Sequence, residues 1–250
     1  MKQTAAVRRR RVLGVLGVCI LLAAWGTAIA LFDIKPYIAP SPQLVLETLY
    51  QKRALLWTNL LPTAMEAAGG FAIGNLVAIL IATVFVHNRT LQQLFFPAVL
   101  IFNSIPIVAK APILVLIMGN GIEPKITIAA LVCLFPTLVN AVRGLESPPP
   151  QQLELMRTLS ASPAEIFFRL RLMNALPFIF SGLRISATMC VIGAVVGEWI
   201  GTDVGVGAMI IQATYNFDSP LLYAAIFLCA ALSGFFFFLV ALAERLLVRG

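Results

Sequence analysis

The chain has 250 residues, of which 60% are hydrophobic and only 12% are charged, and its mean hydropathy is +0.94. A soluble domain has about 45–50% apolar and about 25% charged residues, so this composition excludes an ordinary soluble enzyme, a disordered chain and a disulfide-stapled secreted domain, and it predicts an integral membrane protein. The formal net charge of +7 does not indicate a nucleic-acid partner, because the basic residues flank apolar runs and form no basic stripe with interleaved aromatic residues.

Six apolar runs are long enough to cross a membrane as helices. A helix of about 20 residues spans the hydrocarbon core of a bilayer. The runs are continuous rather than alternating, which argues against strands. We therefore predict an all-α integral membrane protein with a single domain over residues 1–250 and six spans at 12–32, 63–86, 94–118, 126–144, 178–200 and 221–246.

Lysine and arginine are distributed unevenly between the segments that join these spans. If the N-terminus is cytoplasmic, 13 of the 18 basic residues lie in cytoplasmic segments or towards the cytoplasmic ends of spans and four lie in outer segments, while Lys110 falls deep inside a span. Cytoplasmic segments of membrane proteins carry the excess of basic residues. Both termini are therefore predicted to be cytoplasmic, with residues 1–11 as the N-terminal segment and residues 145–177 as the longest cytoplasmic loop.

The first apolar run allows a second interpretation. Arg8–Arg11, the run itself and Ala28–Ala30 also fit a signal peptide with an A-x-A cleavage site. The run is longer than the usual core of a signal peptide, which favours a retained span. Cleavage would leave five spans.

A polar stretch, 33–60, follows the first span. Pro36, Pro40 and Pro42 interrupt its start, and the leucines that follow give it amphipathic helical character. Helices of this kind lie in the plane of the membrane interface. We expect this stretch to lie along the outer surface.

The third span carries two prolines and a cation. Pro106 and Pro112 are expected to disturb the helix and free backbone carbonyls, which membranes tolerate where a cavity is lined. Lys110 lies about 16 residues, or roughly 24 Å, into the span. Because charges within a membrane are candidates for function, Lys110 either contacts a polar or anionic solute in a translocation path, or snorkels outward, or pairs with Glu198. The other candidate polar residues of such a path are Asn103, Ser104, Asn140 and Glu198 itself.

Two short helices are predicted in the 145–177 loop. Pro148–Pro150 end the fourth span, and the run that follows carries Glu154 and Arg157, which can pair on a helix surface. Ser162–Glu165 has the pattern of a capping box with proline at the first helical position, and the second helix is expected to end near Pro177. The helix pair forms a compact knob whose apolar side chains contact the protein's own bundle, lipid headgroups or a groove of a soluble partner. They are Leu155, Met156, Leu159, Phe167 and Phe168.

Glycines recur every four residues in and just after the fifth span, at Gly193, Gly197 and Gly201. A small-x-x-x-small pattern lets two helices approach closely. It predicts either a contact between two copies of the chain or close packing within one bundle.

Motifs of catalysis and metal binding are absent from the sequence. It has no G-x-x-x-x-G-K-[ST] phosphate loop and no cluster of Asp, Glu and His for hydrolysis. The four cysteines lie in apolar runs without C-x-x-C spacing, and the lone histidine, His87, has no partner for a metal site. We expect a non-catalytic chain with no metal and no cofactor of its own.

The loop resembles the coupling-loop motif of ABC importer permeases, which is Glu-Ala-Ala followed by Gly-Ala and a proline-rich stretch. Glu154 and Ala161 match this pattern, Ser160 replaces the glycine, and Ala175–Pro177 matches its end. Leu155 and Met156 replace the two alanines, and Met173 stands where a proline is common.

The resemblance covers most of residues 38–245. It is closest to the branch that imports nitrate, sulfonates and taurine, which includes permeases for pyrimidine precursors and riboflavin. The other matching segments are Ser41–Pro42, Gly70–Gly74, Pro106–Pro112, Gly182–Arg184, Gly197–Trp199 and Gly205–Gly207.

The resemblance implies a permease subunit in the bacterial cytoplasmic (inner) membrane that works by alternating access. Its implied partners are cytoplasmic ATPases that bind ATP and Mg, an external solute-binding protein and a second permease, as a homodimer or a heterodimer. The implied ATPase-coupling residues are Glu154, Leu155, Met156, Arg157, Leu159, Ser160, Ala161, Ser162 and Pro163.

Two other classes compete with this interpretation. An ion-coupled secondary transporter would show inverted repeats and acidic residues at the membrane midplane. The sequence shows no repeat, and Glu198 does not lie at the midplane. A membrane assembly or scaffold protein would use the 145–177 loop as a contact. The transported solute stays open among nitrate, sulfonate, taurine, a pyrimidine precursor and riboflavin.

Overall fold

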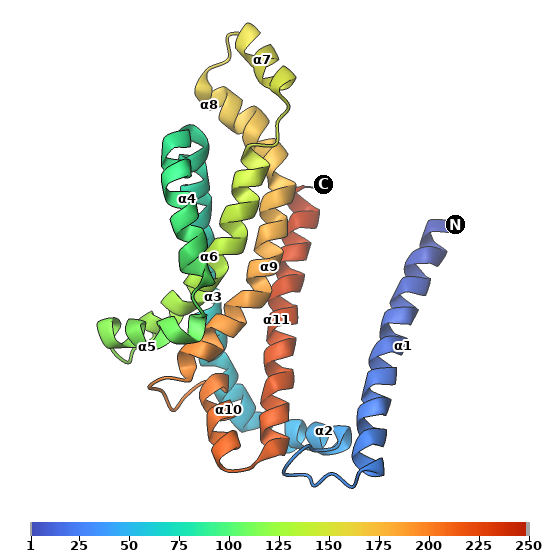
Figure 1. Ribbon diagram of the computed structural model, residues 1–250. Helices are drawn as coiled ribbons and strands as arrows, with labels where there is room; N and C mark the ends of the chain where they lie inside the picture. The colour runs from blue at the N-terminus through green and yellow to red at the C-terminus, as the bar shows by residue number, and fades with distance from the viewer. Residues whose placement is uncertain (1, 249–250) are drawn as a thin grey trace. The chain divides into compact units, whose positions relative to one another are not determined.

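The computed structural model describes residues 2–248, with the side chains of residues 2–12, 14 and 15 outside the description, and every element in it is helical (Figure 1). The basic residues of the N-terminal segment and Arg249, which contribute to the predicted sidedness, therefore lie outside the described side chains. The elements are α1 (Lys2–Leu31), α2 (Pro42–Gln51), α3 (Arg53–His87), α4 (Arg89–Ser104), α5 (Ile107–Met118), α6 (Glu123–Leu145), α7 (Pro150–Thr158), α8 (Pro163–Glu165), the π-helical turn η1 (Ile166–Arg171), α9 (Leu172–Glu198), α10 (Val206–Tyr215) and α11 (Ser219–Leu247).

Four of the described helices are long and apolar enough to cross a membrane: α3, α6, the continuous helix Pro163–Glu198 and α11. The pair α4 and α5 adds a fifth span if the two count as one. The first predicted span falls in α1, whose described apolar part, Leu16–Leu31, is shorter. The all-α membrane class is thus confirmed, while six spans and the sidedness of the termini stay predictions.

The third predicted span, 94–118, is divided between two helices, and the disturbance expected at Pro106 is present. α4 and α5 meet at a bend of 99°. Ile105, at the bend, is extended (ψ 125°), because the residue before a proline is disfavoured in a helix and Pro106 has no N–H to continue the hydrogen-bond ladder. Pro112, in contrast, lies inside α5 without ending it. The depth predicted for Lys110 along a straight span therefore does not apply.

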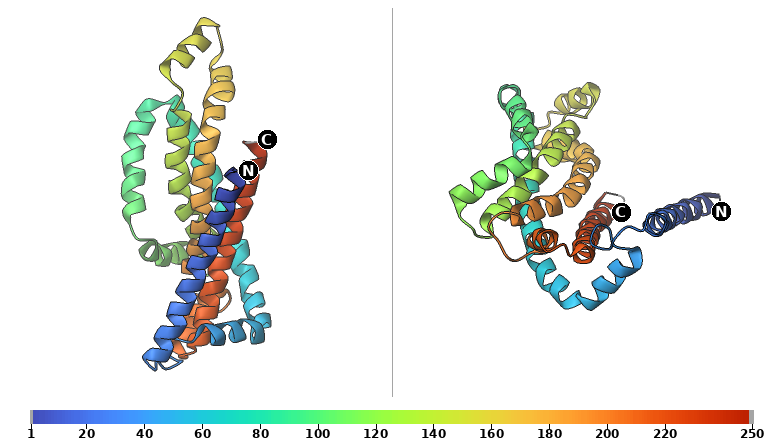
Figure 2. Two further views of the ribbon diagram at one scale, coloured as in Figure 1. Left: turned by 90° about the vertical axis from the view of Figure 1, so that its right-hand side faces the viewer. Right: turned by 60° about the horizontal axis from the view of Figure 1, so that its bottom comes forward.

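α6 lies against both α3 and α9 through small residues, and α6 and α9 run side by side (Figures 1 and 2). A Cβ added to Gly193 of α9 would lie only 2.6 Å from the Cα of Ala129 in α6, and one on Gly197 would lie 3.0 Å from the Cα of Lys125. The first two glycines of the repeat, Gly193 and Gly197, therefore pack against another helix of the same chain. Gly201 lies beyond α9 in a turn with φ +73°, where glycine has no steric penalty.

Buried polar side chains link the same three helices. The hydroxyl of Thr137 (α6) donates to Oδ1 of Asn75 (α3) at 2.5 Å and lies 2.8 Å from the hydroxyl of Ser186 (α9). The Ser186 hydroxyl also lies 2.8 Å from the carbonyl oxygen of Cys133, to which it can donate. Interhelical hydrogen bonds of this kind hold membrane helices together where the hydrophobic effect between helices is weak.

The chain forms two compact units. One comprises residues up to Trp57 together with Met209–Phe227, and the other comprises Thr58–Ala208 together with the residues from Leu228 onward. In the first unit, Trp25 of α1 stacks on Tyr223 and Phe227 of α11, with ring centroids 5.7 and 6.0 Å apart. Ser41 caps α2, and Pro42 is the first residue of that helix.

Candidate functional site

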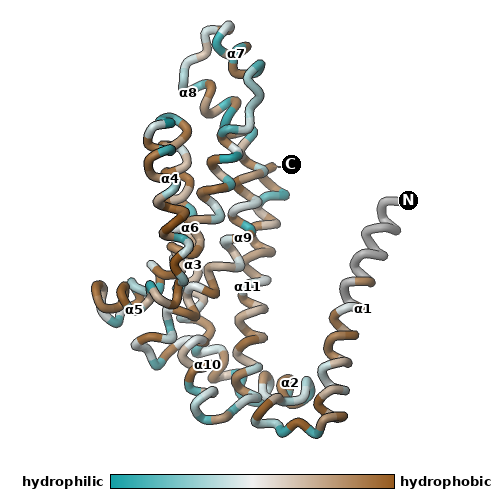
Figure 3. Tube along the Cα trace, in the orientation of Figure 1, coloured by the Kyte–Doolittle hydropathy of each residue, from teal (hydrophilic) through white to brown (hydrophobic). Residues whose placement is uncertain are grey.

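Residues 150–171 form the knob predicted between the fourth and fifth spans, and hydrophilic residues gather there (Figure 3). A turn at Ser160 separates α7 from α8. The N–H of Ser160 donates to the carbonyl of Arg157 and the N–H of Ala161 donates to the carbonyl of Met156, both at 2.9 Å. This is the Schellman arrangement, which needs a left-handed residue after the helix. Ser160 supplies it with φ +53°, and this is the position at which the importer motif has glycine.

The second helix of the knob begins with the predicted capping box. The Ser162 hydroxyl accepts from the N–H of Glu165 at 3.3 Å, and the Glu165 carboxylate accepts from the N–H of Ser162 at 2.9 Å. These hydrogen bonds stabilise the charged carboxylate and lower the pKa of Glu165, which lies in the predicted loop outside the membrane. The expected end of this helix near Pro177 is wrong: the helix continues to Glu198 through η1, because surrounding packing supports a proline inside a membrane helix.

The inner side of the knob is attached to its own bundle. Nη1 of Arg171 donates to the carbonyl of Leu145, the last residue of α6, at 2.9 Å. The Phe167 ring lies 5.1 Å from the His87 ring at the end of α3 and packs against the core between α3, α6 and α9. Phe167 therefore packs against the protein's own helix bundle, one of the three contacts predicted for the apolar side chains of the knob.

The face of the knob that points away from the helix bundle, called its outer side below, is exposed. Leu155 is 59% exposed and Leu159 is 69% exposed, and Phe168 is also exposed. The predicted pair of Glu154 and Arg157 does not form, since no ion pair joins these side chains in the described part of the chain. Both are solvent-exposed on α7, where an ion pair gains little over hydration.

Two of the predicted path residues lie together. Asn103 of α4 and Lys110 of α5 line a cavity of about 380 Å³ between α3, α4, α5 and α6. Its other lining residues are apolar, among them Phe95, Phe102 and Phe135. The Lys110 ammonium lies 4.3 Å from the centroid of the Phe102 ring, a cation–π contact. The bend between α4 and α5 thus places one cation and one amide in an apolar cavity.

The other predicted path residues do not line this cavity. The hydroxyl of Ser104 donates to the carbonyl of Leu100, and the amide of Asn140 donates to the carbonyl of Pro136. Glu198 forms no pair with Lys110, so that predicted alternative is wrong.

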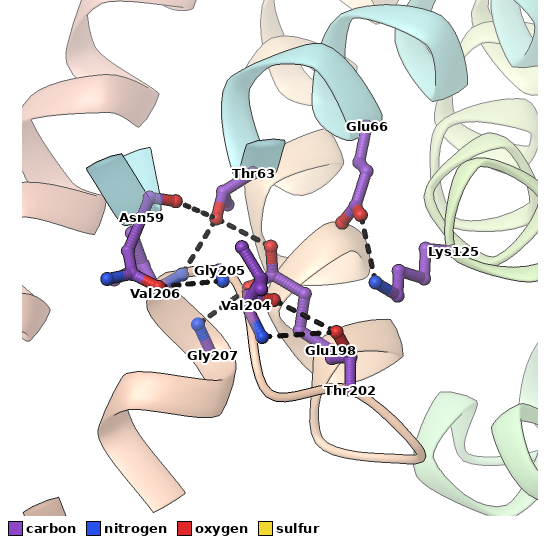
Figure 4. Close-up of polar contacts among 10 residues, drawn as sticks. All are labelled: Asn59, Thr63, Glu66, Lys125, Glu198, Thr202, Val204, Gly205, Val206 and Gly207. Carbon is purple, nitrogen blue, oxygen red and sulfur yellow. Dashed lines mark hydrogen bonds and ion pairs between the residues drawn. The ribbon is translucent and has the colours of Figure 1, made fainter. Parts of the chain in front are cut away.

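Glu198 belongs instead to a buried clamp at the start of α10, defined by Asn59, Thr63 and Glu198 (Figure 4). Glu198 is 1% exposed, and its carboxylate accepts from the Thr63 hydroxyl through Oε1 and from the N–H of Gly207 through Oε2, both at 2.6 Å. Thr63 in turn accepts from the N–H of Val206, and Asn59 accepts from the N–H of Gly205, both at 2.9 Å.

The clamp satisfies three successive backbone N–H groups where α10 begins. The first N–H groups of a helix have no partner within the helix and carry the positive end of its dipole. A carboxylate, a hydroxyl and an amide oxygen from α3 and α9 fill that need here. Glu198 therefore has a structural role at the start of α10.

A buried ion pair lies beside the clamp and escaped the sequence analysis (Figure 4). Nζ of Lys125 lies 3.2 Å from Oε1 of Glu66, and the two residues are 9% and 1% exposed. Lys125 was predicted to lie in an outer segment, but its neighbours α3 and α9 cover it. Glu66 could have been identified from the sequence, because an acidic residue within an apolar run is a candidate for pairing or function.

The sequence matches the family model described as "Binding-protein-dependent transport system inner membrane component" over residues 74–250. A probable ABC transporter permease protein of Haemophilus influenzae is 35% identical over 86% of this chain and 87% of its own length. The riboflavin transport system permease protein RibX of Chloroflexus aurantiacus is 34% identical over 92% of this chain and 87% of its own, and the formylaminopyrimidine transport permease protein ThiX of Halalkalibacterium halodurans is 32% identical over 92% of both.

The match covers more than half of the chain, and the described helices are those of a multi-pass membrane protein. Proteins of this family are non-catalytic membrane components of transport systems, and the family implies ATPase and solute-binding partners on other chains. The chain belongs to the family of binding-protein-dependent transport system inner membrane components, as an ABC transporter permease.

Proposed function

We propose that this chain is the permease subunit of an ATP-driven importer and that the knob couples it to a separate cytoplasmic ATPase. The observation that carries the proposal is the two-sided knob. Its inner side is hydrogen-bonded to the end of α6 and in ring contact with the end of α3, while Leu155 and Leu159 stay exposed on its outer side. A rigid, docked element with an uncovered apolar face suits the groove of a soluble partner.

The continuous helix Pro163–Glu198 is the proposed lever. Its 36 residues reach about 54 Å at the rise of an α-helix. The knob lies at one end, the Glu198 clamp lies at the other, and Gly182, Gly193 and Gly197 pack its second half against α6. A push on the knob would move α9 and α6 together, which is the kind of rigid-body motion that alternating access requires.

The proposed path for the solute passes the cavity of Asn103 and Lys110. The cavity offers an ammonium, an amide and aromatic surface to a small organic or anionic solute. The relatives carry names of riboflavin, formylaminopyrimidine, aliphatic sulfonate and taurine systems, and we assign this chain a solute of the same broad kind. The proposal includes six spans, with the first retained, cytoplasmic termini and a bacterial inner-membrane location.

The coupling role is tested by Glu154→Lys. Glu154 is exposed and makes no ion pair within the described residues, so its replacement costs the permease no internal contact. We expect normal membrane insertion, continued ATP hydrolysis by the assembled complex and loss of solute uptake. Proteoliposomes that hold the permease, its ATPase and the solute-loaded binding protein provide the measurement, and Glu123→Lys on the exposed start of α6 is the matched control. Unchanged uptake by Glu154→Lys contradicts the coupling role.

The partnership itself is tested by co-purification. Leu155→Asp combined with Leu159→Asp should release an ABC ATPase that the wild-type permease retains. Leu46→Asp, at an equally exposed leucine of α2, should retain it. Uptake by the permease alone, without nucleotide, would favour an ion-coupled transporter instead.

A further inference from the structure

A second cavity lies beneath the knob, on the side away from Leu155 and Leu159. Its volume is about 360 Å³, which is within the range of small-molecule sites. It lies between the end of α3 and the two arms of the knob. Its lining includes Arg157, Arg171, His87, Leu153, Ile166 and Phe167.

The charged groups that line this cavity are cationic. Arg157 and Arg171 form no ion pair within the described part of the chain, and no carboxylate lines the cavity. Two of the acidic side chains near it in sequence have other partners: the Glu165 carboxylate accepts from the N–H of Ser162 and lies 3.9 Å from Arg169, and Glu146 accepts from the Gln92 amide at 3.1 Å. Glu154 is exposed on α7 and does not line the cavity. Two guanidinium groups therefore share one cavity without a counter-charge.

The two arginines come from different elements of the knob. Arg157 belongs to α7, and Arg171 ends η1. One N–H of Arg171 is bound to the Leu145 carbonyl, which holds its guanidinium in place and leaves four of its five donors. Planar guanidinium groups match the oxygens of a phosphate through paired hydrogen bonds. Leu153, Ile166 and Phe167 offer apolar surface to whatever the phosphate carries.

We propose that this cavity binds a phosphate ester between Arg157 and Arg171. The ester is either the headgroup of an anionic phospholipid or a free phosphorylated solute, which present the same chemistry to the two guanidinium groups. A bound ester would join α7 to η1 and so brace the knob from beneath. The lining shares Arg157, Ala161 and Pro163 with the implied coupling residues, but Leu155 and Leu159 of the proposed ATPase contact do not line the cavity. Its occupancy is measurable without any ATPase.

The first test measures binding of glycerol 3-phosphate and inorganic phosphate to the full-length permease in a neutral detergent, by calorimetry. Arg157→Gln is the deciding variant, because the described Arg157 side chain forms no hydrogen bond or ion pair that its loss would break. We expect at least tenfold weaker binding than wild type, the equivalent of about 1.4 kcal/mol. Arg169→Gln removes the same charge two residues from Arg171 but outside the cavity lining, and should bind as wild type.

The second test distinguishes the two sources. Thermal unfolding is compared in nanodiscs of phosphatidylglycerol and of phosphatidylcholine, for wild type, Arg157→Gln and Arg169→Gln. Stabilisation by phosphatidylglycerol that Arg157→Gln loses identifies a lipid headgroup. Binding of glycerol 3-phosphate in detergent without such a lipid effect identifies a free phosphate ester.

Three results would overturn the site. The first is that wild type binds neither glycerol 3-phosphate nor inorganic phosphate and gains no stability from phosphatidylglycerol. The second is that Arg157→Gln behaves as wild type in both tests. The third is that Arg169→Gln weakens binding as much as Arg157→Gln, which would show a general attraction to a basic surface.

Discussion

Removal of the Glu198 carboxylate tests the buried clamp most directly. Glu198→Ala takes the acceptor away from the N–H of Gly207 and from the Thr63 hydroxyl. The Thr63 hydroxyl has a second acceptor, the Asn59 carbonyl at 3.1 Å, and can turn to it. Within the described part of the chain the N–H of Gly207 has no acceptor other than this carboxylate, so it would stay buried and unpaired.

The expected cost follows from these contacts. An unsatisfied buried donor costs about 1–3 kcal/mol, and the weakened Thr63 contact adds about 1 kcal/mol, so Glu198→Ala should lower the free energy of unfolding by about 2–4 kcal/mol. Glu198→Gln keeps one acceptor oxygen and should lose about half as much. Glu123→Ala removes an exposed carboxylate and should stay within about 0.5 kcal/mol of wild type.

Two measurements test this order. Denaturant titration in mixed micelles gives the free energy of unfolding, and hydrogen exchange of the amides of residues 205–207 reports the clamp directly. A double-mutant cycle of Thr63→Val with Glu198→Ala should show coupling of about 1 kcal/mol or more, because the side chains touch. Additive losses, or protected amides in Glu198→Ala, would refute the clamp.

Three further changes probe the knob, the helix packing and the path. Ser160→Gly should stabilise the knob by about 1 kcal/mol, because φ +53° strains a residue with a Cβ, and slower exchange of the Ala161 amide would show it. Gly193→Leu should destabilise the protein by about 3 kcal/mol or more through a clash with α6, whereas Gly17→Leu, with no atom within 4 Å of an added Cβ, should be neutral in the same unfolding titration. Lys110→Met should insert normally and reduce uptake roughly 10- to 150-fold if Lys110 binds the solute, and near-normal uptake would exclude that contact.

Local features of the fold were predictable because they depend on neighbours in the sequence. The Ser41 cap and the Ser162–Glu165 capping box join residues three apart, so their side chains meet wherever a helix begins. The break before α5 follows from Pro106 for the same reason. The apolar runs predicted membrane helices, since length and composition decide whether a segment is stable in lipid.

Features that join distant residues needed the tertiary structure. The clamp links Thr63 to Glu198 across 135 residues and Asn59 to Gly205 across 146. Because hydropathy measures only the cost of burying Glu66, Lys125 and Glu198, it cannot tell which partner offsets that cost.

The sequence by itself determined the class of this protein and the shape of its loop, because apolar length and local hydrogen bonding act within single segments. Only the tertiary structure decided that Gly193 and Gly197 pack against α6, that Glu198 holds the start of α10, and that Lys110 shares a cavity with Asn103. The physical reason is that packing and charge compensation depend on distances between helices that are far apart in the sequence, here α3, α6 and α9.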